Sequence, residues 1–146
     1  MIDLAAIRFG DARITAKLWG KISVNTNNGC WEWTDHLNEH GYGQAYHAGK
    51  MWRAHRLFYS LLAEPPAGLT LDHLCRTRHC VNPNHMEPVS NKENVRRGIG
   101  PTAINHRKTH CPQGHPLSGE NLRVITTTGF RQCRQCMRRH DVAHKA

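Results

Sequence analysis

The stretch LDHLCRTRHCVNPNHMEPV, residues 71–89, together with the NKENVRR that follows at residues 91–97, decides how the chain folds. The first segment is expected to open and close with short strands around a loop rich in Cys, Arg and Asn. The preceding Ser90 and the later Glu93 have the spacing of a capping box, which predicts a helix over the second segment. Strand, loop, strand and capped helix therefore follow one another.

This order places Asp72 and His73 at the end of a strand and Asn94 one turn into the helix, so their side chains are expected to converge. Asp72 and Asn94 offer the hard oxygen ligands that Mg²⁺ or Mn²⁺ prefers. His73 titrates near neutrality, so it can act as a general base. The three residue types suit phosphodiester hydrolysis, although Asp-His pairs are common and Asn94 is equally compatible with an exposed helix position.

The same two segments resemble the active-site region of HNH endonucleases, closest to the phage and intron types with a ββα-metal fold. They are also similar to the His-Cys box homing endonucleases, which share that fold. The likeness extends back through Gly29-Cys-Trp-Glu-Trp33, Gly41-Tyr-Gly43 and Ala54-His-Arg-Leu57, and covers about residues 12–137. The resemblance implies a small α+β nuclease that hydrolyses phosphodiester bonds in duplex DNA.

The resemblance also assigns roles to individual residues. His73 matches the general base, and Asp72 and Asn94 match the positions that bind the catalytic Mg²⁺ or Mn²⁺. The middle position of the motif falls on His85, with Asn82 as a second candidate whose spacing fits less well. In His-Cys box enzymes a histidine at this place binds zinc together with three cysteines. By that comparison Cys30, Cys75, Cys80 and His85 form a first structural Zn²⁺ site, and the role of His85 stays open between zinc ligand and middle motif residue.

A second Zn²⁺ site is predicted by spacing alone. Cys111 and His115 are separated by three residues, Cys133 and Cys136 by two, and a polar stretch lies between the pairs. Few large apolar residues surround them, so a metal is the plausible source of folding energy for this part of the chain. His110 adjoins the first pair and competes with His115 as the fourth ligand. Together the two sites use all six cysteines.

Composition places the chain in a cellular compartment and suggests its partner. The start has no long apolar run, and no stretch approaches the length needed to cross a bilayer, so no membrane association is expected. An intracellular (cytoplasmic) protein, such as one encoded by a phage within its host, would keep its thiols reduced, which favours zinc over disulfides. The formal net charge of +9 predicts a polyanionic partner, and nucleic acid is favoured over a membrane surface or a merely basic surface.

Residues 42–54 are expected to form a β-hairpin around the turn at residues 47–49, of the kind that lies in the DNA major groove. Basic residues elsewhere are expected to hold phosphates. The residues assigned to DNA binding are Gln44, Tyr46, Lys50, Arg53, Arg56, Arg76, Arg78, Arg96 and Arg97. The basic track is extended by Arg107, Lys108, Arg131, Arg134, Arg138 and Arg139.

The sequence therefore predicts an α+β chain in four parts. These are an N-terminal arm with a short helix (residues 1–29), the nuclease core (30–98), a linker beginning at the breaker cluster of residues 98–101 (99–110), and a treble-clef-like or ribbon-like zinc module (111–146). A non-catalytic zinc-containing nucleic-acid-binding module remains the alternative function, and an RNA-directed nuclease is a third. The number of strands cut is open, and both a monomer and a homodimer are compatible with the resemblance.

Overall fold

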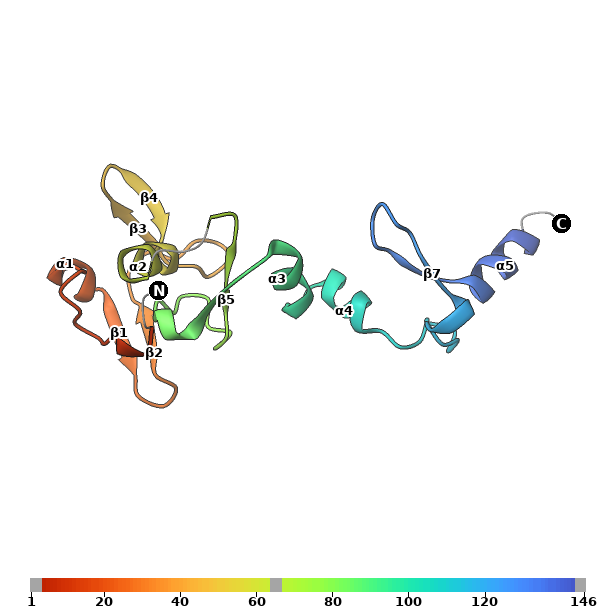
Figure 1. Cartoon of the computed structure of the whole chain (residues 1–146), viewed down its shortest axis with the longest axis horizontal. Helices are drawn as coiled ribbons and strands as arrows, with labels where there is room; N and C mark the ends of the chain where they lie inside the picture. Colours follow the sequence, from red (N-terminus) through yellow and green to blue (C-terminus); the bar gives the residue numbers. More distant parts are fainter. Residues whose placement is uncertain (1–3, 64–66, 144–146) are drawn as a thin grey trace. The chain divides into compact units, whose positions relative to one another are not determined.

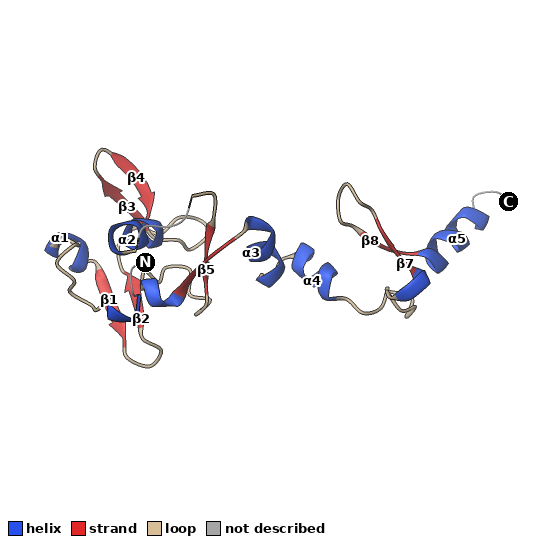
Figure 2. Cartoon of the chain, viewed as in Figure 1, coloured by secondary structure: helices blue, strands red, loops and turns tan. Residues whose placement is uncertain are grey.

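The computed structural model describes residues 4–63 and 67–143, which divide into two compact units, residues 1–94 and 95–146. It is a mixed α+β protein built from short elements and two-stranded antiparallel sheets (Figures 1 and 2). Unit 1 contains, in order, η1 (Leu4–Ala6), α1 (Ala16–Trp19), β1 (Ile22–Asn25), β2 (Cys30–Trp33), β3 (Gln44–His47), β4 (Lys50–Arg53), α2 (Ala54–Leu62), β5 (Thr70–His73), η2 (Pro83–His85), β6 (Met86–Val89) and most of α3 (Asn91–Arg97). Unit 2 contains α4 (Pro101–Arg107), η3 (Gly119–Asn121), β7 (Leu122–Val124), β8 (Arg131–Cys133) and α5 (Arg134–Ala143).

The hydrophobic core of unit 1 forms around α2. Phe58 is fully buried, and its ring contacts Trp19 and Trp33 edge-on, with centroid distances of 5.4 and 6.1 Å. The helix spacing of Leu57, Phe58 and Leu62 puts all three on the buried side, as their positions in the sequence predict. This core holds the β1–β2 hairpin and α2 in fixed positions, and both elements contribute to the candidate site.

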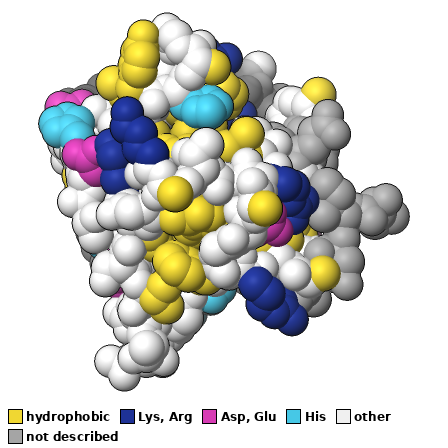
Figure 3. All heavy atoms as spheres, turned by 90° about the vertical axis from the view of Figure 1, so that its left-hand side faces the viewer, with side chains coloured by type: hydrophobic (Ala, Val, Ile, Leu, Met, Phe, Trp, Pro, Cys, Tyr) yellow, Lys and Arg dark blue, Asp and Glu magenta, His cyan; other side chains and the backbone are white. Residues whose placement is uncertain are grey.

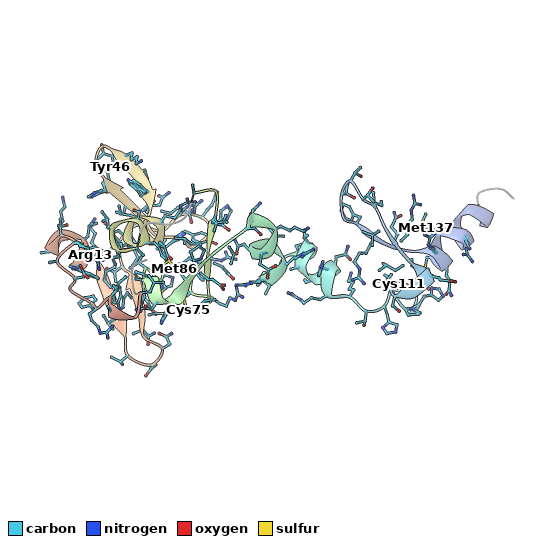
Figure 4. The ribbon with its side chains drawn as sticks, viewed as in Figure 1. Arg13, Tyr46, Cys75, Met86, Cys111 and Met137 are labelled. Carbon is cyan, nitrogen blue, oxygen red and sulfur yellow. The ribbon has the colours of Figure 1, made fainter. Side chains whose placement is uncertain are left out.

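The predicted hairpin over residues 42–54 is present as β3 and β4, paired in register from Gln44 with Arg53 to His47 with Lys50. Ala48 and Gly49 both have positive φ, 49° and 78°, which is the conformation of a two-residue turn that matches strand twist. The hairpin projects from the rest of unit 1, and Tyr46 on it is 70% exposed (Figures 1 and 4).

The strand, strand and helix order predicted for residues 69–97 is present as β5, β6 and α3. β5 and β6 are antiparallel, with His73 opposite Met86 and Asp72 opposite Glu87. The loop between them is long and ends in the short turn of η2. At the start of α3 the Ser90 hydroxyl accepts a hydrogen bond from the backbone N–H of Glu93 (3.1 Å), which is the predicted N-cap contact.

Unit 2 begins at Val95, and α4 occupies residues 101–107 of the range 99–110 that was expected to be a linker. Pro101 stands at the first turn of α4, where proline is favoured, and Ala103 is fully buried. The β7–β8 hairpin pairs Leu122 with Cys133 and leads directly into α5. Among the described side chains of unit 2 only Ala103, Leu117 and Cys133 are buried, so this unit has little hydrophobic core.

Candidate functional site

His73 is held at the end of β5 in one orientation. Its side chain is 7% exposed, and its Nε2 lies 3.1 Å from the carbonyl oxygen of Cys80. Because a carbonyl oxygen only accepts, the ring hydrogen belongs on Nε2, which leaves the lone pair of the neutral ring on Nδ1. Burial lowers the pKa of His73, while the Cys80 carbonyl and the Asp72 carboxylate act in the opposite direction. The ring is therefore a neutral base at physiological pH with a defined acceptor atom.

Asp72 precedes His73 on β5 and is 4% exposed. One of its carboxylate oxygens, Oδ1, accepts a hydrogen bond from Nη1 of Arg76 at 2.8 Å. Arg76 is in the turn after β5 and has a positive φ of 59°, which is strained for a residue with a side chain. The turn thus folds the guanidinium of Arg76 back onto the carboxylate of Asp72, which is expected to bind a cation. From the sequence, Arg76 was expected to bind phosphate, and this contact with Asp72 was not predicted.

Two asparagines of the predicted motif have different surroundings. Asn94 lies in α3, where its backbone N–H bonds to the carbonyl of Ser90 at 2.9 Å, and its side chain is half-buried. α3 follows directly after β6, the partner strand of β5, so Asn94 belongs to the same local unit as Asp72. Asn82 is 6% exposed; its side chain donates to the carbonyl of Gly29 (2.9 Å) and accepts from the backbone of Asn84 (3.0 Å). The side chain of Asn82 therefore links the loop before β6 to the β1–β2 turn at Gly29.

The first Cys/His cluster brings together the four residues predicted for it: Cys30, Cys75, Cys80 and His85. Nδ1 of His85 lies 3.5 Å from the sulfur of Cys30 and 3.6 Å from that of Cys80. In a tetrahedral zinc site, bond lengths of about 2.3 Å to sulfur and 2.0 Å to nitrogen put these atoms about 3.5 Å apart. The donor types and their separations therefore fit a metal ion, and His85 contributes Nδ1 to this cluster.

The second cluster contains Cys111, His115, Cys133 and Cys136. Nδ1 of His115 lies 3.5, 3.6 and 3.4 Å from the three sulfurs in that order, and the sulfurs of Cys111 and Cys136 are 3.6 Å apart. Gly114, at φ 79°, closes the turn that places Cys111 beside His115. His110 is not a member of this cluster, and its Nδ1 lies 3.0 Å from the hydroxyl of Thr109.

The thiols within each cluster shift one another's pKa. Burial raises the pKa of Cys133, but hydrogen bonds from Cys136, Asn121 and Cys111 outweigh it and lower that pKa to about 6. Other thiols are shifted upward. Burial raises the pKa of Cys80, and the neighbouring Cys75 and Cys30 raise it further. Burial together with Cys111 and Cys133 raises the pKa of Cys136 to about 11. A bound cation reverses this effect, because a coordinating thiol is deprotonated. All six cysteines are free of disulfides, so both sets remain available to a metal.

The residues assigned to DNA binding do not share one environment. Gln44, Tyr46, Lys50 and Arg53 are on the β3–β4 hairpin, and the guanidinium of Arg53 lies 5.0 Å from the centre of the Tyr42 ring. Arg78 donates to the carbonyl of His40 and also lies beside Tyr42. The remaining four are on other elements: Arg56 on α2, Arg76 after β5, and Arg96 and Arg97 at the end of α3.

Tyr42 and His55 lie beside His73, and neither was predicted from the sequence to have a role there. The His55 ring packs edge-on against that of His73, with centroids 4.7 Å apart, and the Tyr42 ring is 5.5 Å from His55 and 6.0 Å from His73. His55 is 7% exposed, and its buried Nδ1 has no hydrogen-bond partner among the described residues. Burial, with the nearby charges of His73, Arg56 and Arg53, lowers the pKa of His55 to about 3. The sequence offered one indication of this role, a histidine at the start of a helix. The residue that His55 contacts, His73, is 18 positions further along the chain, so no local pattern connects the two.

The fold and site define a small α+β protein with two Cys₃His clusters that can hold metal ions. No helix in the described ranges 4–63 and 67–143 is long and apolar enough to cross a membrane. The chain belongs to the family of protein 2.8 of Escherichia phage T7, with which it is 33% identical over 111 residues, 75% of this chain and 71% of the T7 protein. It is also 35% identical to protein 7.7 of the same phage over 66 residues, 44% of this chain and 51% of that protein. No family model and no solved structure matches the sequence.

Proposed function

We propose that this protein is a metal-dependent HNH endonuclease of the ββα-metal type that hydrolyses phosphodiester bonds in duplex DNA. The observation that carries the proposal is the state of His73: buried and neutral, with its tautomer fixed by the Cys80 carbonyl and a carboxylate one residue away on the same strand. A general base needs a lone pair at a defined place, and Nδ1 supplies it. The order of β5, β6 and α3 supports the same assignment.

In the proposed reaction Nδ1 of His73 takes a proton from a water molecule as the water oxygen attacks phosphorus. The bond from phosphorus to the 3′ oxygen breaks, which leaves a 5′ phosphate and, once the 3′ oxygen is protonated, a 3′ hydroxyl. Asp72 and Asn94 would hold a Mg²⁺ or Mn²⁺ ion, which stabilises negative charge on the phosphate and on the leaving oxygen. Arg53 and Arg78 lie beside Tyr42 near the His73 ring and would hold the phosphate backbone.

Both Cys/His clusters are proposed to bind structural Zn²⁺. The first would tie the loop that follows His73 to β2 through Cys30, and so keep the Cys80 carbonyl in contact with the His73 ring. The second would organise the turn at Cys111, the β7–β8 hairpin and the start of α5, an arrangement like that of a treble clef. The relatives in phage T7 support a phage-encoded protein acting inside a host cell.

The test is conversion of supercoiled plasmid by the zinc-loaded protein with Mg²⁺, with Mn²⁺, or with no added divalent ion. Omitting the ion is preferable to adding a chelator, which would also strip zinc. Open-circle or linear product should require the ion, and the ratio of the two forms reports nicking against double-strand cutting. His73→Ala should reduce the rate by at least about 100-fold while DNA affinity and zinc content stay unchanged. Wild-type cutting by this variant would show that the assignment is wrong.

The alternative is a non-catalytic nucleic-acid-binding module, and one observation favours it. Arg76 already neutralises the carboxylate of Asp72 at 2.8 Å, which reduces the affinity of that oxygen for a cation. Arg76→Gln distinguishes the two functions. For an enzyme, the variant should need less Mg²⁺ for half-maximal cutting. For a binding module, neither protein cuts at any Mg²⁺ concentration.

A further inference from the structure

Positive charge is distributed very unequally between the two units. Residues 95–146 contain ten Lys and Arg against two Asp and Glu, a formal net charge of +8. Residues 1–94 contain ten Lys and Arg against nine Asp and Glu, a net charge of +1. The face of unit 1 in Figure 3 accordingly has scattered Lys and Arg side chains, some of them beside acidic ones, and no continuous basic surface. The attraction for a polyanion therefore resides mainly in unit 2.

Two arginines of unit 2 donate hydrogen bonds to backbone carbonyls of the same unit. Arg107 donates to the carbonyls of Arg96 and Gly98 at 3.0–3.1 Å. Arg131 donates through Nη1 to the carbonyls of Asn105, His106 and Lys108, and through Nη2 to that of Leu117. Its side chain thus links the end of α4 to the β7–β8 hairpin. The exposed Lys108, Arg123 and Arg134 are better placed to contact a ligand.

A pocket of about 540 Å³ lies where Arg131 makes this link. α4 contributes Ile104 and Asn105 to its walls, and the hairpin contributes Phe130. Ile104 is 48% exposed and Phe130 59% exposed, so two large apolar side chains face solvent in the most basic part of the chain. Lys108 lies on the same wall as Ile104. Because Arg131 ties the helix end to the hairpin, the two walls are held together without a ligand.

We propose that this pocket binds an unstacked nucleobase of a DNA strand, with the ring against Phe130 and the adjoining phosphates against Lys108 and its basic neighbours. The proposal rests on the nucleic-acid-binding part of the proposed function and is independent of cleavage. An exposed aromatic side chain among cations is how single strands are commonly held, because every base has a π-face. Bases in an intact duplex are stacked and cannot enter, so the pocket selects an unpaired region.

The test is binding of a fluorescent single-stranded DNA by the full-length, zinc-loaded protein in buffer without Mg²⁺ or Mn²⁺, where no cutting occurs. The same sequence as a duplex is measured in parallel. Phe130→Ala should weaken single-strand binding about tenfold, which is the usual range for one stacked base, and duplex binding by less than twofold. Phe130→Trp should restore single-strand affinity, because a larger aromatic ring replaces the first.

Val124→Ala is the matched control, since Val124 is on the same hairpin and 49% exposed but does not line the pocket. It should bind both DNA forms as the wild type does. Equal weakening of both forms by Phe130→Ala, unchanged single-strand binding, or no rescue by Phe130→Trp would each overturn the proposal. So would binding of neither DNA form by the wild type, the result expected if the pocket serves a protein partner. Because no cutting occurs in this assay, failure of the nuclease proposal is distinguished from failure of the pocket.

Discussion

The two units each contain a Cys₃His cluster, yet they surround it very differently. In unit 1 Cys30 and Cys80 are fully buried beside a hydrophobic core that includes Trp31 and Val81. In unit 2 the cluster is half-exposed apart from Cys133, and few apolar side chains are buried around it. A metal would therefore add a constraint to unit 1, which already has a hydrophobic core. In unit 2 a metal would take the place of such a core. Small chains commonly need such a staple.

The largest expected effect is loss of unit 2 when its cluster is broken. Cys136→Ser should abolish the fold of residues 95–146, because zinc binding supplies on the order of 10 kcal/mol in small metal-dependent modules. Amide signals of this unit should collapse to the narrow range of an unfolded chain in an NMR spectrum. Zinc content should fall from two ions to one. Signals from unit 1 should keep their positions.

Cys75→Ser makes the equivalent change in unit 1 and serves as the counterpart. It should also remove one zinc ion, but the core around Phe58 should keep the unit folded. The loop after His73 would lose its tie to Cys30. The cutting rate should therefore fall strongly, while the free energy of unfolding of unit 1 falls less. Complete unfolding of unit 1 by Cys75→Ser would contradict the proposed difference between the units.

The second expected effect concerns packing. Phe58→Ala removes a fully buried ring that contacts two tryptophans, and should lower the free energy of unfolding of unit 1 by about 3–5 kcal/mol. All four tryptophans precede residue 53, so tryptophan fluorescence during urea unfolding reports unit 1 alone. Leu117→Ala in unit 2 should leave that transition unchanged. A shift caused by Leu117→Ala would show that the units do not unfold independently.

The sequence predicts the parts of this fold that depend on local spacing. The hairpin over residues 44–53, the strands on either side of the loop at residues 74–85 and the second Cys/His cluster follow from turn residues, alternation and ligand spacing. The first cluster was predicted from the resemblance to the His-Cys box enzymes. The contacts of His55 with His73, and of Arg131 with α4, join residues 18 or more positions apart, and no local pattern reports them. The breaker cluster before Pro101 predicted a linker, yet proline at a helix N-terminus is equally a start signal, and α4 begins there.

A third prediction tests whether hydrogen bonds from one arginine replace packing in unit 2. Arg131→Lys keeps the positive charge but loses the planar fork that reaches four carbonyls. Loss of two charge-assisted hydrogen bonds should lower the stability of unit 2 by about 3 kcal/mol. The midpoint of zinc release during urea titration measures this change. Lys108→Gln is the control, since its exposed side chain should be replaceable without effect on that midpoint.

The smallest expected effect is a pH dependence carried by His55 in unit 1. Its pKa falls from 6.5 to about 3 on folding, mainly through burial, so the unfolded chain binds a proton that the folded chain excludes. Stability is therefore fully present above about pH 7 and declines as the pH falls through 6.5 towards 3. Between pH 7 and pH 5 this amounts to about 2 kcal/mol. His55→Phe keeps a ring beside His73 but cannot be protonated.

Urea unfolding followed by tryptophan fluorescence at pH 7 and pH 5 measures this dependence in both proteins. Zinc release and the other histidines contribute equally to each, so the difference between the two pH dependences isolates His55. Between pH 7 and pH 5 the free energy of unfolding of the variant should fall by about 2 kcal/mol less than that of the wild type. Identical pH dependences would mean that His55 gains a proton in the folded protein. The buried Nδ1 would then have to find an acceptor, and the neutral pair of rings assigned to the site of His73 would be wrong.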